Sequence, residues 1–140
     1  MLDQIKINNY KFMKKVIVLE DEKVLREVYK KTLSSAGYEV VGVETAEDAE
    51  EIIKKFHPDL FLIDHGLAGE KEGIEALPNF KKQFPNSIFI VFSNYNDFHL
   101  QNIALESGAD AYWIKINMSL KDLLENVSNL LSGKRECLMR

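Results

Sequence analysis

The sequence has one cysteine, three prolines and no excess of positive charge. Because the lone Cys137 cannot form an internal disulfide, we expect a reducing, cytoplasmic environment. No apolar run approaches the ~18 residues of a membrane span, and the N-terminus lacks the apolar segment of a signal peptide. The 18 Lys and Arg are outnumbered by 22 Asp and Glu, and this net charge of −4 argues against a nucleic-acid-binding surface.

The 140 residues, 46% hydrophobic and 29% charged, suit one domain with a proper core. Short apolar runs alternate with amphipathic stretches, which is typical of βαβ units around a parallel sheet. The runs are continuous, as expected when helices cover both faces of the sheet. We expect a domain over 13–132, an N-terminal extension over 1–12 and a tail over 133–140. The expected strands are about 15–20, 38–43, 59–64, 87–93 and 110–115, and the helices about 22–36, 46–56, 73–84, 97–107 and 120–131.

Local signals support several of these boundaries. Thr45 and Ser119 are suitable N-caps, whereas Gly37 and Gly108 suit the position just after a helix. Pro78 lies inside the expected helix 73–84, so the sequence predicts a kink or a late start there.

Polar side chains end four of the five apolar runs. Glu20 and Asp21 follow the first run, Asp64 the third, Ser93 the fourth and Lys115 the fifth. Because the carboxyl ends of parallel strands share one edge of a sheet, where ligands bind, these groups should converge. Three carboxylates, a hydroxyl and an amine suit a divalent cation and a phosphoryl group.

Each of these residues also has a purely structural interpretation. A strand-end Asp64 can cap a loop, Lys115 can be a surface lysine with a buried stem, and Ser93 can cap the next helix. Acidic Glu20 and Asp21 suit the start of a helix. Five such residues in this order, each at a strand end, argue against coincidence.

The order and spacing of these residues resemble the receiver domain of two-component response regulators, over about 14–131. The stretch 108–112 before Lys115 adds to the likeness. The resemblance is to the chemotaxis-regulator type and implies an α/β, flavodoxin-like (βα)5 fold. Such a fold is a three-layer sandwich with parallel strand order 2-1-3-4-5, two helices on one face and three on the other.

The resemblance also implies a role for each residue. Asp64 would accept the phosphoryl group, and Ser93 and Lys115 would hold its oxygens. Tyr112 would be the aromatic residue that switches together with Ser93. The Mg²⁺ ligands would be Glu20, Asp21, Asp64 and the backbone carbonyl of Gly66.

By the same resemblance, the chain would be a signalling phosphoprotein that catalyses only its own phosphorylation and slow dephosphorylation. The donor would be a sensor histidine kinase or a histidine phosphotransfer protein. Output would pass through the face formed by helix 97–107, the last strand and helix 120–131 to a downstream protein effector. The segment 132–140 is too short for a DNA-binding domain, so we expect no direct contact with nucleic acid, nor with a membrane. The chain would be a monomer or a transient, phosphorylation-dependent dimer.

Some positions depart from the family pattern. Ile116 follows Lys115 where the family usually has a cis proline, which leaves open a strained cis bond or a trans bond that aims Lys115 differently. Gly66 has no side chain to orient an attacking water, and the bulky Tyr95 can shade the phosphoryl group. We therefore predict slow self-dephosphorylation.

The sequence also allows two alternatives to a phosphoacceptor domain. A receiver-like interaction domain that is never phosphorylated is the main alternative. A flavodoxin-like electron carrier fits poorly, because the acidic run 20–22 would repel a cofactor phosphate. His57, His65 and His99 lack metal-ligand spacing, and His65, next to Asp64, is either a neighbour of the site or a solvated loop residue.

Overall fold

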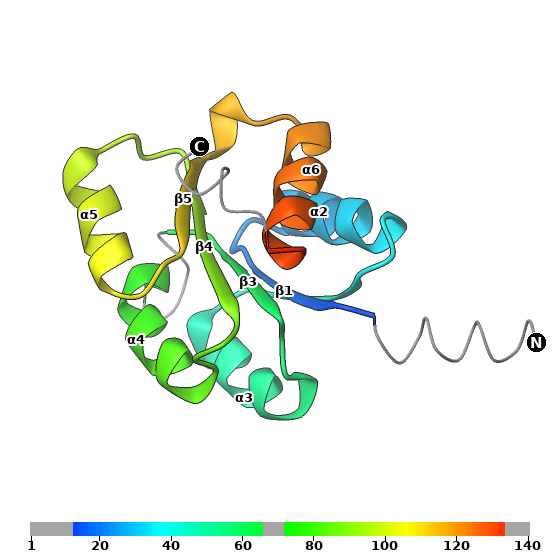
Figure 1. Cartoon of the computed structure of the whole chain (residues 1–140), viewed down its shortest axis with the longest axis horizontal. Helices are drawn as coiled ribbons and strands as arrows, with labels where there is room; N and C mark the ends of the chain where they lie inside the picture. Colours follow the sequence, from blue (N-terminus) through cyan, green and yellow to red (C-terminus); the bar gives the residue numbers. More distant parts are fainter. Residues whose placement is uncertain (1–12, 66–71, 134–140) are drawn as a thin grey trace, which may run out of the picture.

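The computed structural model describes residues 13–65 and 72–133, built around a parallel sheet (Figure 1). Its five strands lie in the order β2-β1-β3-β4-β5, which confirms the expected topology. Strand β1 pairs with both β2 and β3, with Leu19 opposite Val43 and Ile63. The strands are β1 (Lys15–Leu19), β2 (Glu39–Val43), β3 (Leu60–Ile63), β4 (Ile88–Ser93) and β5 (Ala111–Ile114).

Helices cover both faces of this sheet (Figure 1), and the two hydrophobic clusters assign two helices to one side and three to the other, as expected. The pair consists of α2 (Lys23–Ser35) and α6 (Leu120–Leu131), and the three are α3 (Ala46–Phe56), α4 (Gly73–Gln83) and α5 (Phe98–Glu106). A short 3₁₀ turn, η1 (Lys115–Asn117), joins β5 to α6. None of the helices in the described ranges is long and apolar enough to cross a membrane.

Strands β1, β3, β4 and β5 are buried on both faces, so each contributes to two separate hydrophobic clusters. The edge strand β2 is half-buried along most of its length. On the side of α3, α4 and α5, the Phe61 ring stacks on Phe89 at 4.5 Å and on Phe80 at 5.3 Å between centroids. On the side of α2 and α6, Trp113 is fully buried. This double burial explains why the strands read as uninterrupted apolar runs.

The predicted caps are present. Thr45 Oγ1 accepts a hydrogen bond from the Asp48 amide at 3.1 Å, and Ser119 forms a reciprocal capping box with Asp122. Gly37 and Gly108 have φ of +99° and +118°, the left-handed conformation that glycine adopts at helix ends.

The helix expected over 73–84 is confirmed, since α4 begins at Gly73 and continues through Pro78. Of the two outcomes expected at Pro78, a kink or a late start, the late start is therefore wrong. Packing determines the start at Gly73. A Cβ on Gly73 would lie 2.4 Å from the Asp64 carbonyl oxygen and 2.5 Å from Ile63 Cγ2. Only glycine lets the first turn of α4 lie directly against the end of β3.

Candidate functional site

Three carboxylates meet at the carboxyl end of the sheet. Glu20 and Asp21 follow β1 and Asp64 follows β3, and each offers an oxygen within 4.8 Å of the others. The hydrogen-bond ladder extends one residue beyond these strands: the Asp64 amide donates to the Leu19 carbonyl at 2.8 Å, and the Glu20 amide to the Val43 carbonyl at 3.0 Å. The backbone of the sheet therefore holds the acidic residues side by side.

Lys115 extends from the end of β5 into this acidic cluster. Its Nζ lies 2.5 Å from Glu20 Oε1 and 3.1 Å from Asp64 Oδ1. The ammonium group also lies 5.8 Å from the centroid of the Phe92 ring and 6.0 Å from that of Tyr29. The bond between Lys115 and Ile116 is trans, so a trans bond still directs this amine to the site.

Burial and mutual repulsion shift the protonation of the carboxylates. Burial, together with the Glu20 carboxyl group, raises the pKa of Asp64 to about 8, although Lys115 acts in the opposite direction. Burial and Glu20 also raise the pKa of Asp21. Burial also tends to raise the pKa of Glu20, but hydrogen bonds with Asp64 and Lys115 outweigh burial, so the pKa of Glu20 lies below its ordinary value. The Lys115 ammonium therefore does not neutralise the cluster.

The donor set fits a hard divalent cation. Mg²⁺ prefers carboxylate and carbonyl oxygens and keeps several waters, so two or three carboxylates at one opening are sufficient. A cation among them would also offset the burial and the repulsion from Glu20 that together raise the pKa of Asp64 and Asp21. Gly66, expected to add a carbonyl oxygen, lies outside the described residues, and its role remains a prediction.

Ser93 lies in the cleft with the carboxylates, and both Ser93 and Tyr112 are hydrogen-bonded to the backbone of Tyr95. Both are buried, at 1% and 2% exposure. Ser93 Oγ accepts a hydrogen bond from the Tyr95 amide at 3.1 Å, and the Tyr112 hydroxyl donates to the Tyr95 carbonyl at 2.7 Å. Tyr112 is buried in this structure, and its role as the aromatic residue that switches together with Ser93 remains a prediction.

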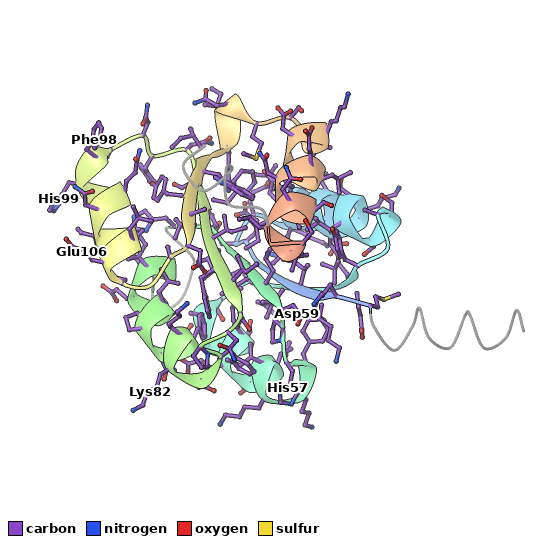
Figure 2. The ribbon with its side chains drawn as sticks, in the orientation of Figure 1. His57, Asp59, Lys82, Phe98, His99 and Glu106 are labelled. Carbon is purple, nitrogen blue, oxygen red and sulfur yellow. The ribbon has the colours of Figure 1, made fainter. Side chains whose placement is uncertain are left out.

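The carboxylates, Ser93 and Lys115 line a cleft of about 420 Å³, and His65 and Tyr95 line it with them. His65 is therefore a neighbour of the site, an alternative that the sequence had left open. A larger cavity of about 570 Å³ lies at the opposite edge of the sheet, between His57 and Phe84, but no carboxylate lines it. His57 and His99 project from separate parts of the molecule (Figure 2).

Sequence reasoning missed Arg26. Its Nη1 donates a hydrogen bond to the Glu20 carbonyl oxygen at 2.9 Å, which fixes the loop that carries Glu20 and Asp21. The side chain lies over Gly42 of β2, where an added Cβ would be 3.0 Å from Arg26 Cγ. The available signal was a glycine inside a strand, which often marks a close approach of another group.

Comparison with known proteins agrees with this geometry. The family model for the response regulator receiver domain matches residues 16–128. In solved structures, the fold is similar to a CheY-like response regulator receiver domain protein from Methanospirillum hungatei JF-1. That match has 29% identity and a TM-score of 0.80, and covers 86% of this chain and 94% of the other. The BeF3-activated DrrB receiver domain matches at 25% identity and a TM-score of 0.77, over 86% and 99%.

Curated relatives are longer proteins. The chain is 28% identical over 120 residues to the transcriptional regulatory protein DegU of Brevibacillus brevis, covering 84% of this chain and 50% of the relative. It is 33% identical over 103 residues to the transcriptional regulatory protein YhcZ of Bacillus subtilis (strain 168), covering 72% and 48%. The chain thus spans about half the length of the curated relatives it matches.

Proposed function

The chain belongs to the response regulator receiver domain family, and on this basis we propose that Asp64 is its phosphoacceptor, with Mg²⁺ as cofactor. The observation that carries the proposal is the contact of Lys115 Nζ with both Glu20 and Asp64 inside a cluster of three carboxylates. This arrangement supplies a nucleophile, ligands for a cation and a fixed positive charge at one opening. Phosphoryl transfer requires these groups and little further covalent chemistry from the protein.

The proposed reaction is a transfer from a phosphohistidine on a sensor kinase or phosphotransfer protein. An ionised Asp64 oxygen forms the new P–O bond, the P–N bond breaks, and its electron pair returns to the imidazole of the donor. Mg²⁺, held by Glu20, Asp21 and Asp64, would neutralise charge on the phosphoryl oxygens. Lys115 would exchange its contact with Asp64 for a phosphoryl oxygen, and the Ser93 hydroxyl would donate to another. In this proposal the chain is a signalling module that catalyses only the phosphorylation of its own Asp64.

We further propose that the signal leaves through the surface formed by α5, β5 and α6. The Ser93 hydroxyl can donate to a phosphoryl oxygen while it still accepts from the Tyr95 amide. A movement of Ser93 toward the phosphoryl group would therefore pull on the Tyr95 backbone, to which the Tyr112 hydroxyl also donates. Tyr95 and Phe98 are exposed by 57% and 82%, and Phe98 projects from the start of α5 (Figure 2). A bonding change inside the site is therefore transmitted to an exposed aromatic surface. The proposed partner is a downstream protein, and transient dimerisation of phosphorylated chains is a second outcome to measure.

Mass spectrometry tests the phosphoacceptor directly. The protein is incubated with acetyl phosphate or phosphoramidate and Mg²⁺, and we expect a gain of about 80 Da, the mass of a covalent phosphoryl adduct. The gain should disappear in Asp64→Ala and in EDTA, whereas Asp59→Ala, a carboxylate at the opposite end of β3, should retain it. A wild-type protein that gains no mass with either donor would favour a receiver-like interaction domain that is never phosphorylated.

A further inference from the structure

Two aromatic rings meet at one side of the cleft that contains Asp64. The His65 ring lies 5.4 Å from the Tyr95 ring, centroid to centroid, at an interplanar angle of 80°. His65 directly follows the proposed phosphoacceptor, and Tyr95 belongs to the loop that follows Ser93. The ring pair therefore connects the loops after β3 and β4, the two strands that carry Asp64 and Ser93.

The backbone of Tyr95 is fixed, but its side chain is not enclosed. Its amide and carbonyl groups are bound by Ser93 and Tyr112, while 57% of the residue is exposed. The ring contact that the structure gives this side chain is with His65. A large exposed side chain loses rotamer freedom when it is held in one position, so a ring that holds it changes how often it lies over the cleft.

The contact uses the ring of His65 and not its Nδ1 atom. Nδ1 is buried and has no hydrogen-bond partner within the described ranges. Edge-to-face packing is a favourable geometry for two aromatic rings and needs no charge on either. A phenylalanine at position 65 should therefore preserve the arrangement, whereas an alanine should release Tyr95.

We propose that His65 is a positioning residue that holds the Tyr95 ring over the cleft and so prolongs the lifetime of phosphorylated Asp64. This inference rests on the proposed function. In hydrolysis, a water oxygen forms a bond to phosphorus and the P–O bond to Asp64 breaks. The electron pair returns to the Asp64 carboxylate, and a proton of the water passes to solvent with release of inorganic phosphate. His65 and Tyr95 both line the cleft that contains Asp64, so in this proposal the ring pair restricts the approach of water from their side.

The test measures the half-life of the adduct. Wild type and variants are phosphorylated with phosphoramidate, the donor is removed, and loss of the adduct is followed by mass spectrometry at constant pH and saturating Mg²⁺. We expect His65→Ala to shorten the half-life roughly three- to tenfold, the range corresponding to one edge-to-face ring pair. His65→Phe should stay within about twofold of wild type, because the ring pair is retained. The exposed His99→Ala is the matched control and should change nothing.

Two further measurements separate positioning from a general structural effect. Mg²⁺ affinity and the urea midpoint of His65→Ala should remain near wild type, because His65 is neither one of the three clustered carboxylates nor a member of the two hydrophobic clusters. Tyr95→Ala should shorten the half-life as well, and His65→Ala added to it should have no further effect, because the pair is already lost.

The outcomes distinguish this inference from the proposed function. An adduct that forms normally but decays at the same rate in wild type, His65→Ala and Tyr95→Ala overturns the inference alone. A His65→Phe variant whose adduct decays as fast as that of His65→Ala also overturns it. A wild-type chain that forms no adduct overturns the proposed function and this inference with it.

Discussion

Replacing Asp64 by asparagine should stabilise the metal-free protein, even though it removes the proposed phosphoacceptor. The pKa of Asp64 is raised from its ordinary value of 3.8 to about 8, so the folded protein disfavours the ionised carboxylate. Asparagine has the shape of the protonated acid. Its amide can still donate to Glu20, and its oxygen can still accept from Lys115. The variant therefore keeps the local hydrogen bonds without the buried negative charge.

The size of the effect follows from linkage. A carboxyl group with a raised folded-state pKa contributes stability that is complete below the unfolded value of 3.8 and is lost as pH rises to about 8. Each pH unit in this window corresponds to about 1.4 kcal/mol, which gives an upper limit on the order of 5 kcal/mol at pH 8. Relaxation and entry of water into the cleft reduce this value. We expect Asp64→Asn to be more stable than wild type by about 2–3 kcal/mol at pH 8 and by less than about 1 kcal/mol at pH 4.5.

Urea unfolding followed by far-UV circular dichroism, in EDTA at pH 4.5, 6 and 8, measures the difference. Asp48→Asn, which makes the same change at an exposed carboxylate in the first turn of α3, is the matched control. The reasoning is refuted if Asp64→Asn is no more stable than wild type at pH 8, or if its advantage is the same at every pH. Added Mg²⁺ should reduce the advantage, because the ion stabilises only the wild-type carboxylate cluster.

Three other predictions concern the metal and the supporting residues. Apparent Mg²⁺ affinity should rise with pH by up to about tenfold per unit until about pH 8, because a proton on Asp64 competes with the ion. Calorimetry in two buffers would count the proton that is released on binding. An affinity that does not change with pH would contradict the raised pKa. Arg26→Gln should weaken Mg²⁺ binding roughly tenfold, with Arg26→Lys intermediate, because the Glu20 carbonyl loses its hydrogen-bond donor. Equal Mg²⁺ affinities of wild type and Arg26→Gln in calorimetry would exclude a role of Arg26 in positioning the metal ligands. Gly73→Ala should destabilise the protein by about 1–3 kcal/mol in urea, because its Cβ overlaps the Asp64 carbonyl; an unchanged midpoint would mean that α4 does not pack on β3 in this way.

Much of the fold could be predicted because its signals are local. Five apolar runs predicted five strands, each end within one residue of the observed one. Thr45 and Ser119 marked helix starts through hydrogen bonds that span only three residues. The order of the strands came from a family resemblance and not from these patterns, because pairing joins residues far apart in the chain.

Local rules failed where packing opposed them. Pro78 removes a helical hydrogen bond, and the sequence therefore predicted a kink or a late start in this segment. The observed start at Gly73 depends on the absence of a side chain beside the Asp64 carbonyl, a contact between two separate elements. Arg26 was missed for the same reason, since its role depends on the space above Gly42 of the neighbouring strand.

The sequence by itself determined where strands and helices lie and which polar residues end the strands, because both follow from the order of side chains along a local stretch of chain. Tertiary structure decided what those residues do to one another. It placed the Lys115 amine between Glu20 and Asp64, raised the pKa of Asp64, buried Tyr112 and set the His65 ring against Tyr95. These properties depend on short distances between residues that are far apart in the sequence and on the exclusion of water. Both arise only when the sheet brings the distant segments together.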